Sequence, residues 1–168
     1  MRKQRWLTAL LAVALLLAAC GGKEAENLED GCVLWFCTPA GENHGPALIS
    51  QPCTLENPGP EELLTALLAG PASEESLSPF PRGVTVRQCI PDEERPGVLL
   101  VDLSEQYGAL ADVSLTLADY SIVLTLSQLE GVEGVEITAG GHRVSYRSHQ
   151  LLNAQEAVLR DELADTAS

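Results

Sequence analysis

Two segments without charged residues, on either side of residue 40, have the apolar and turn-forming pattern of a β-hairpin. Val33–Thr38 and Ala47–Thr54 are predicted strands, and the connection Pro39–Pro46 is rich in proline and glycine, which favour turns. If the hairpin is centred on this connection, Cys32 lies opposite Cys53 on the neighbouring strand. The pattern therefore predicts two antiparallel strands that carry facing cysteines at the end away from the turn.

Apolar residues at helical spacing predict two helices. The first begins at Pro60 and stops at Gly70 and Pro71, residue types that favour the start and the end of a helix in these positions. The second runs from Ser114 to about Glu130. The apolar stripes consist of Leu63, Leu64, Leu67 and Leu68 in the first helix and of Leu115, Ala118, Ile122, Leu126 and Leu129 in the second. Such stripes are typical of helices that pack against other elements with one face.

Further apolar segments are predicted strands of a sheet. In Val84–Ile90 polar and apolar residues alternate, which places Val84, Val86 and Ile90 on one face. Val98–Leu103 is apolar almost throughout, as in a central strand that is covered on both faces. The remaining predicted elements are strands over Val135–Thr138 and Arg143–Tyr146 and a helix in the tail Leu151–Leu163. This order indicates a small α+β fold, in which two helices pack on a mixed sheet and a C-terminal helix follows.

The N-terminal part of the chain has the features of an export signal with a lipid site. Arg2, Lys3 and Arg5 precede the uncharged segment Trp6–Ala19, which is short for a membrane span and typical of a signal peptide. Small residues precede Cys20, as in a bacterial lipobox, so we expect cleavage before this residue and a diacylglyceryl group on its thiol. An ordinary signal peptide with an incidental cysteine and a short anchor helix are the alternatives.

Charge and composition divide the chain into four predicted parts. These are a signal peptide (1–19), a lipid-anchored flexible linker (20–31), a folded domain (32–147) and a C-terminal helix or tail (148–168). The 168 residues carry a net charge of −14, and the seven basic and 24 acidic residues left after removal of the signal peptide give −17. Because so acidic a domain cannot neutralise phosphates, nucleic-acid binding is excluded. We expect the domain at the extracytoplasmic face of the cell membrane.

Four cysteines remain in the exported part of the chain, namely Cys32, Cys37, Cys53 and Cys89. Four cysteines allow three pairings, and sequence alone does not choose among them. The predicted hairpin favours a bridge between Cys32 and Cys53, which would leave Cys37 and Cys89 for each other. Free buried thiols are the main alternative, whereas the wide and irregular gaps do not fit the spacing of a zinc site.

No residues have the spacing of a catalytic site. His44, His142 and His149 lie in predicted turns or near the tail, away from other metal-ligating side chains. Asp102 and Ser104 lie at the end of a predicted strand, but Ser104 lacks the tight glycine turn and the histidine partner of a nucleophile. We expect Asp102 to accept hydrogen bonds from backbone amides.

Cofactor sites are also not indicated. The acidic run Asp92-Glu93-Glu94 lacks the spaced ligands and the glycine of a calcium loop. Gly140-Gly141 lacks the further glycines of a phosphate-binding loop. We therefore expect no cofactor and no metal ion. A third hypothesis, an envelope hydrolase, would require an acidic or nucleophilic pair in one cleft, for which Asp102 and Glu105 are the best candidates.

Several segments together resemble a known domain family. The first helix ends in Leu-x-Gly-Pro at Gly70-Pro71, Pro79–Gly83 leads into a strand, and Val101-Asp102-Leu103-Ser104 is followed by Tyr107. The helix Ser114–Leu129 and then Val132, Val135, Ile137 and Gly141 complete the series. In this order the segments resemble the GerMN domain of sporulation and spore germination proteins, over residues 33–147.

The resemblance implies a fold similar to the ring-building motifs of sporulation channel proteins. Members of the family are commonly cell-envelope lipoproteins, and the family brings no catalytic residues that could be assigned here. The four cysteines depart from its usual pattern. We therefore expect a non-enzymatic, membrane-anchored module that assembles with envelope or sporulation proteins. A module that senses cell-wall fragments or a small germinant is the alternative.

Overall fold

The computed structural model describes residues 31–41 and 45–157. The predicted signal peptide, Cys20 and most of the linker lie outside these residues. The strands are β1 (Cys32–Cys37), β2 (Leu48–Cys53), β3 (Val86–Pro91), β4 (Val98–Leu103), β5 (Gly134–Ala139), β6 (His142–Arg143) and β7 (Leu151–Leu152). The helices are α2 (Pro60–Ala69) and α3 (Asp112–Leu126), with short 3-10 helices η1 (Glu105–Ala109) and η2 (Ala154–Glu156). The predicted α+β fold class is confirmed.

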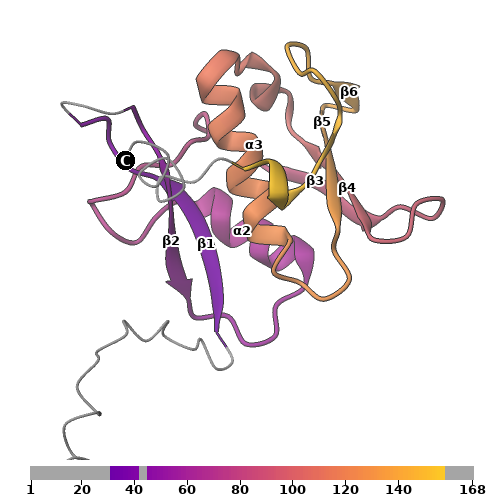
Figure 1. The fold of residues 1–168 in the computed structure, drawn as a ribbon, viewed down its shortest axis with the longest axis horizontal. Coiled ribbons are helices and arrows are strands. Elements are labelled where there is room, and N and C mark those ends of the chain that lie inside the picture. Colours follow the sequence, from indigo (N-terminus) through magenta and orange to yellow (C-terminus); the bar gives the residue numbers. More distant parts are fainter. Residues whose placement is uncertain (1–30, 42–44, 158–168) are drawn as a thin grey trace, which may run out of the picture.

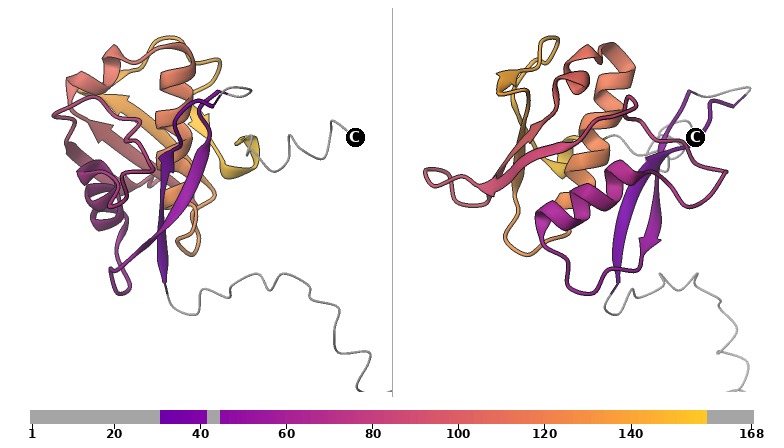
Figure 2. Two further views of the ribbon diagram at one scale, coloured as in Figure 1. Left: turned by 90° about the vertical axis from the view of Figure 1, so that its left-hand side faces the viewer. Right: turned by 180° about the vertical axis from the view of Figure 1, so that it is seen from behind.

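Three layers build the molecule, as Figure 1 shows. The hairpin β1–β2 forms one outer layer, α2 and α3 form the middle layer, and the larger sheet forms the other outer layer. Figure 2 shows the same order from two further directions, with both helices on one side of the larger sheet. The helices therefore bury apolar residues toward two sheets at once.

The larger sheet has five strands in the order β3-β4-β5-β6, and β7 also pairs with β5. β3 and β4 are antiparallel, whereas β4 and β5 are parallel and are connected through α3. In β4, Leu99, Val101 and Leu103 are buried in the core, while Leu100 and Asp102 are half-buried. The prediction that this strand is covered on both faces is wrong, because both helices pack on the same face.

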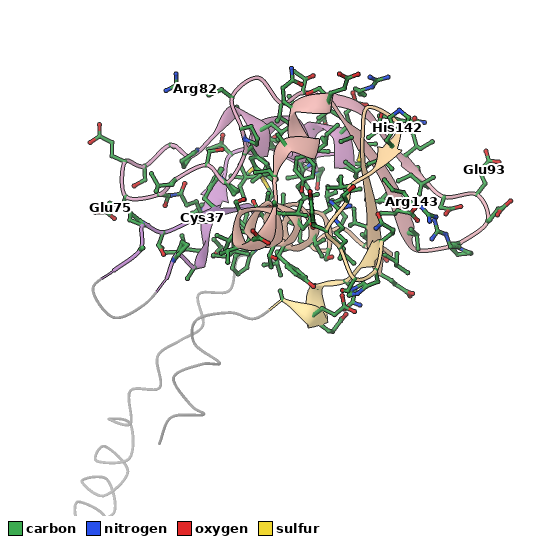
Figure 3. All side chains as sticks on the ribbon, turned by 90° about the horizontal axis from the view of Figure 1, so that it is seen from above. Cys37, Glu75, Arg82, Glu93, His142 and Arg143 are labelled. Atoms are coloured by element: carbon green, nitrogen blue, oxygen red, sulfur yellow. A yellow bond between two sulfur atoms is a disulfide. The ribbon has the colours of Figure 1, made fainter. Side chains whose placement is uncertain are left out.

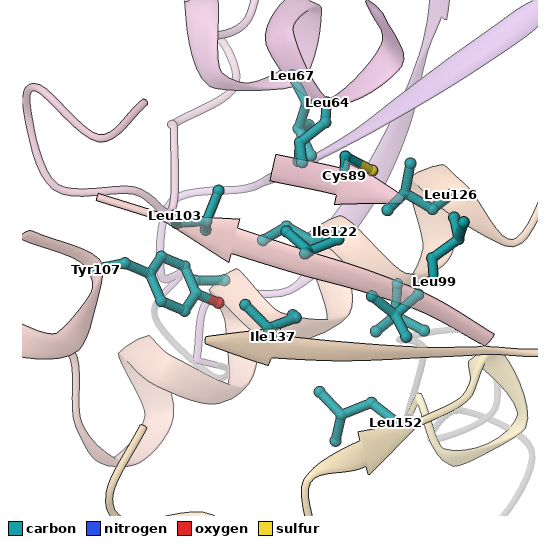
Figure 4. Packing of buried hydrophobic residues seen from close by; sticks show 14 of the residues in the cluster. Leu64, Leu67, Cys89, Leu99, Leu103, Tyr107, Ile122, Leu126, Ile137 and Leu152 are labelled. Carbon is teal, nitrogen blue, oxygen red and sulfur yellow. The ribbon is translucent and has the colours of Figure 1, made fainter. Parts of the chain in front are cut away.

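The core lies between the helices and this sheet. Figure 4 shows Leu64 and Leu67 of α2 above Cys89 of β3, and Ile122 of α3 close to Leu103 of β4. These five residues are buried. Full burial of a leucine or isoleucine side chain contributes about 1.5–3 kcal/mol, so this contact region accounts for much of the packing energy between the layers.

A bulge in β3 overturns one predicted face. The pairing of β3 with β4 shifts its register between Val86 and Gln88, and one extra residue in a strand exchanges its two faces from that point on. Val84 is buried as predicted, but Ile90 is 41% exposed and Cys89 is buried in its place. Regular alternation in the sequence does not reveal an inserted residue.

The C-terminal segment also differs from its prediction. The helix expected from Leu151 is wrong for residues 151–157, which form β7 and the short η2; the rest of the predicted helix lies outside the described residues. Leu152 is buried and pairs with Val135 of β5, so the open edge of β5 determines the conformation. The strand expected over Arg143–Tyr146 ends at Arg143.

Candidate functional site

The predicted hairpin register is confirmed, with Cys32 opposite Cys53 and Cys37 opposite Leu48. The structure contains a disulfide between Cys32 and Cys53, whose Cα atoms are 5.1 Å apart. This bridge joins the two strands at the end where the chain enters the described domain. It therefore closes the hairpin next to the predicted linker.

Cys37 and Cys89 are free and buried, so the expected second bridge is not formed. The reason is their position in different layers: Cys37 ends β1 and forms a backbone bridge with Leu77, whereas Cys89 faces α2 from β3. Burial raises the pKa of the Cys37 thiol to about 11. Burial and then the nearby Glu61 carboxylate raise the pKa of Cys89 to about 11. Both groups are neutral thiols near pH 7 and are poor nucleophiles.

Asp102 and Ser104 are engaged by neighbouring groups. The Asp102 carboxylate accepts hydrogen bonds of 2.7 Å from both the Thr138 hydroxyl and the Gly141 N–H. It also forms an ion pair of 3.0 Å with the Arg87 guanidinium. The expected bond to a backbone amide is therefore confirmed, and the Ser104 hydroxyl accepts the Thr85 N–H at 3.0 Å.

The histidines and the acidic turn occupy peripheral positions. His142 lies at the surface beside Arg143, and Glu93 lies in the projecting β3–β4 turn (Figure 3). His149 Nε2 lies 3.0 Å from a carboxylate oxygen of Glu156, while His44 lies outside the described residues. Within residues 31–41 and 45–157, His, Cys, Asp and Glu side chains form no group of three that could hold a metal ion.

The face of the larger sheet opposite the helices forms a shallow hollow of about 270 Å³. We call this surface the open sheet face; its lining residues are Gln88, Leu100, Val101, Asp102, Glu136, Thr138 and Gly141. Its charges are paired, since Arg87 binds Asp102 and Arg95 Nη2 lies 2.7 Å from Glu136. Leu100 is the apolar side chain of this surface, since Val101 faces the core, and the two carboxylates beside it are neutralised by arginines.

A buried ion pair ties the C-terminal segment to α3. The Arg147 Nε–H donates to the Asp119 carboxylate at 2.7 Å, and both side chains are almost fully buried, at 4% and 5% exposure. Tyr107 donates its hydroxyl to Asp119 at 2.6 Å, and burial, followed by the Asp119 charge, raises the Tyr107 pKa well above its usual value. Arg147 also donates to the carbonyl of Ile137 in β5 at 2.6 Å.

This network was not predicted from the sequence. Arg147 lies in a turn-rich segment, and only its position in the fold shows that it fills the gap between β6 and β7 on the edge of β5. One signal was present in the second helix, where the charged Asp119 directly follows the core position Ala118. A buried acid requires a partner.

Polar side chains of α3 and of the turn that follows it cover the outer edge of β1. Ser121 Oγ donates to the Trp35 carbonyl at 2.5 Å, and Thr125 Oγ1 accepts the Trp35 N–H at 3.1 Å. Gln128 makes both bonds to Val33, of 2.9 and 2.7 Å. The three side chains follow each other at helical spacing, so α3 takes the place of a neighbouring strand.

A match to a protein-family model shows to which family the chain belongs. Residues 43–145 match the family model Germane, described as sporulation and spore germination. This segment is more than half of the chain. The chain belongs to the Germane family. The matched segment runs from the hairpin turn to just beyond β6, and therefore contains the open sheet face.

Solved structures support the same fold for this Germane chain. It superposes with a TM-score of 0.54 and 16% identity on the tandem GerMN domains of the sporulation protein GerM from Bacillus subtilis, covering 83% of this chain and 48% of that one. The first GerMN domain of the same protein gives a TM-score of 0.53 at 16% identity, covering 78% of this chain and 98% of that one. The chain thus spans about half the length of the tandem structure. No curated protein matches it.

Among the residues that the structure describes, no helix has the length and apolar character needed to cross a bilayer. The predicted signal segment and Cys20 lie outside those residues, so the anchor stays a prediction.

Proposed function

We propose that this Germane chain is a lipid-anchored, non-catalytic interaction module that assembles with envelope proteins during sporulation or germination. The observation that carries the proposal is the match of residues 43–145 to the sporulation and spore germination family. The lipobox-like sequence around Cys20 supports an anchor on the extracytoplasmic face of the cell membrane. Fold alone does not define a function, so the chemistry of the surface has to agree with it.

The surface chemistry supports a non-catalytic role. The carboxylate nearest to the strand end, Asp102, is occupied by Arg87, Thr138 and Gly141. A general acid or base needs a free site next to the reacting group and a suitably shifted pKa. The open sheet face instead presents paired charges around the half-buried Leu100, a mixed surface that favours a protein partner.

The linker sets the distance between this surface and the membrane. Ten residues lie between Cys20 and Gly31, which makes eleven steps along the chain, and an extended chain spans at most ~3.3–3.6 Å per residue. The domain would therefore stay within about 40 Å of the acyl chains. Its acidic charge opposes close contact with anionic lipid headgroups, so partners in the space above the membrane are favoured over the lipid surface.

A genetic experiment with the full chain tests both parts of the proposal. Deletion of the gene should lower the yield of spores or the rate of their germination, and the wild-type chain should restore it. Replacement of the lipid site, Cys20→Ala, should abolish palmitate labelling and reduce this restoration. Normal sporulation and germination of the deletion strain would contradict the assigned process, and labelling that persists in Cys20→Ala would contradict the anchor.

The alternative of a ligand sensor has a separate test. A small ligand that binds only the folded state raises thermal stability by mass action, by about 2.7 kcal/mol at a hundredfold excess over Kd. Under our proposal, muropeptides and amino acids leave the melting temperature of the full chain unchanged. A saturable rise in that temperature would favour the sensor.

A further inference from the structure

The two outer edges of the hairpin differ in how their backbone groups are satisfied. Val33 and Trp35 of β1 direct their N–H and C=O groups away from β2 and bond to side chains of α3 and of Gln128 just after it. Cys37 does the same with the backbone of Leu77, at 2.9 and 2.7 Å. The outer edge of β1 is therefore completely covered.

The register then defines the outer edge of β2. In an antiparallel pair, the backbone N–H and C=O groups of two directly opposite residues either hydrogen-bond to each other or both point away from the partner strand. The partners of Val33, Trp35 and Cys37 are Pro52, Ser50 and Leu48, so these three residues direct their backbone groups outward. Among the described residues no segment pairs with this edge.

This edge lacks the usual protection against pairing. Exposed edges are normally shielded by charged side chains, bulges or covering segments, but the described residues from 31 to 55 contain no Asp, Glu, Lys or Arg. Pro52, which has no N–H, is the one edge-blocking residue in β2. Ser50 and Pro52 are exposed, and the neighbouring Ile49 is 43% exposed.

We propose that β2 pairs with β2 of a second copy of this chain, which joins two hairpins into one four-stranded antiparallel sheet. A two-fold axis at Ser50 lets its N–H and C=O bond reciprocally to Ser50 of the second copy. The Leu48 N–H then donates to the Pro52 carbonyl of the second copy, and the symmetric bond forms as well. The missing donor of Pro52 leaves only the Leu48 carbonyl unpaired.

Charge limits the part of the surface through which two copies of this acidic chain can meet. Residues 56–157 carry 16 acidic and five basic residues, so most approaches of two copies bring like charges together. The strands β1 and β2 carry no charged side chain, and two copies that meet along β2 avoid this repulsion. This inference rests on the proposed function in one respect, because anchoring on the same membrane raises the local concentration of the copies.

The oligomeric state of the full chain in detergent, measured by light scattering over a range of concentrations, tests the proposal. We expect a concentration-dependent dimer in the wild type. Ser50→Glu places two carboxylates opposite each other at the axis, which should weaken the dimer about tenfold or more. Thr65→Glu adds the same charge on the exposed side of α2 and should leave the affinity of the dimer unchanged. Ser50→Thr, which adds no charge, should also leave it unchanged.

Cross-linking in membranes provides a second readout that does not depend on detergent. Ser50→Cys should give a covalent dimer with a short bis-maleimide, whereas Thr65→Cys should not. A wild-type chain that stays monomeric, or equal weakening by Ser50→Glu and Thr65→Glu, would overturn the proposal. If the chain is monomeric but Ser50→Glu prevents capture of an envelope protein, the edge binds a different partner and the proposed function stands without the dimer.

Discussion

Arg147 shows how much of this fold depends on single polar residues. Its guanidinium neutralises the buried Asp119 and also satisfies a carbonyl of β5 that neither β6 nor β7 reaches. The preceding Tyr146 has a positive φ of 72° and is 80% exposed. A bulky residue adopts this backbone conformation at a cost of about 1–3 kcal/mol. The ion pair therefore holds the segment in a backbone conformation that is unfavourable by itself.

Replacement of this arginine should strongly destabilise the protein. Arg147→Met leaves Asp119 buried without its counter-ion, and loss of one partner of such a pair costs about 3–5 kcal/mol. The free energy of unfolding from urea titration measures the effect. Arg143→Met is the matched control, because this side chain is exposed and its loss should stay within about 0.5 kcal/mol. Equal losses in both variants would show that the buried pair does not stabilise the fold.

Thiol chemistry distinguishes the four cysteines of the domain. At pH 8 only about one in a thousand Cys37 or Cys89 groups is a thiolate, given pKa values of about 11. In the native protein both should react with a thiol reagent far more slowly than an exposed cysteine. After unfolding without reductant, two thiols besides Cys20, those of Cys37 and Cys89, should react rapidly. Four would contradict the Cys32–Cys53 bridge, and rapid reaction of the native protein would contradict the burial of the free pair.

At the scale of elements, α3 has an unusual double role. Its apolar residues pack between the two sheets, while Ser121, Thr125 and Gln128 hydrogen-bond the edge of β1. A helix between two layers has no broad solvent face, which explains why polar residues occur among its buried positions. Ser121 and Thr125 are fully buried.

The threonine among these polar side chains provides a test with little change in volume. Thr125→Val leaves the Trp35 N–H without its partner, and an unsatisfied buried donor costs about 1–3 kcal/mol. Hydrogen exchange should show faster exchange of the Trp35 amide, together with a lower free energy of unfolding. Thr65→Val on the exposed side of α2 makes the same chemical change and should leave both quantities almost unchanged. If the two variants behave alike, these polar side chains do not hold the hairpin.

The disulfide should stabilise the hairpin in a separable way. Its two cysteines are 21 residues apart, and closure of a loop of this size contributes about 3 kcal/mol in the chain-entropy model. The double variant Cys32→Ala with Cys53→Ala should lose about this amount in urea titration. Dithiothreitol should lower the stability of the wild type but not that of the double variant. An effect of the reductant on both would indicate a different bridge.

The elements of this fold differ in how well the sequence predicted them. Local patterns were sufficient for the hairpin register, for α2 and for β4, because turn residues and apolar spacing act over a few positions. The bulge at Val86–Gln88, the strand conformation of Leu151–Leu152 and the burial of Arg147 were not predictable in this way. Each depends on a neighbour that is distant in the sequence.

The features of the candidate surfaces also divide into those that local sequence patterns predict and those that depend on distant parts of the chain. The role of Asp102 in binding a backbone amide could be predicted from its place at a strand end, and the structure adds Arg87 and Thr138 as further partners. The open sheet face could not be predicted, because the apolar run Val98–Leu103 indicates burial on both sides. Only the placement of both helices on one side leaves it accessible.

At the scale of the whole molecule, two surfaces on different layers are available for contacts. The outer edge of β2 belongs to the hairpin, and the open sheet face belongs to the larger sheet on the other side of the helices (Figures 1 and 2). Under the proposed function, one surface joins copies of the chain while the other binds an envelope protein. Under the same proposal, the acidic remainder keeps the domain away from anionic lipid.

Capture from envelope membranes tests the central claim, assembly with other proteins, most directly. The tagged full-length chain is cross-linked in sporulating cells, and the proteins enriched with it are identified by mass spectrometry. Only proteins other than the chain itself are counted. We expect a defined set of envelope proteins to be enriched with the wild type and lost with Cys20→Ala, which cannot be anchored beside them. Enrichment of no other protein, with the wild-type chain anchored and folded, would contradict it.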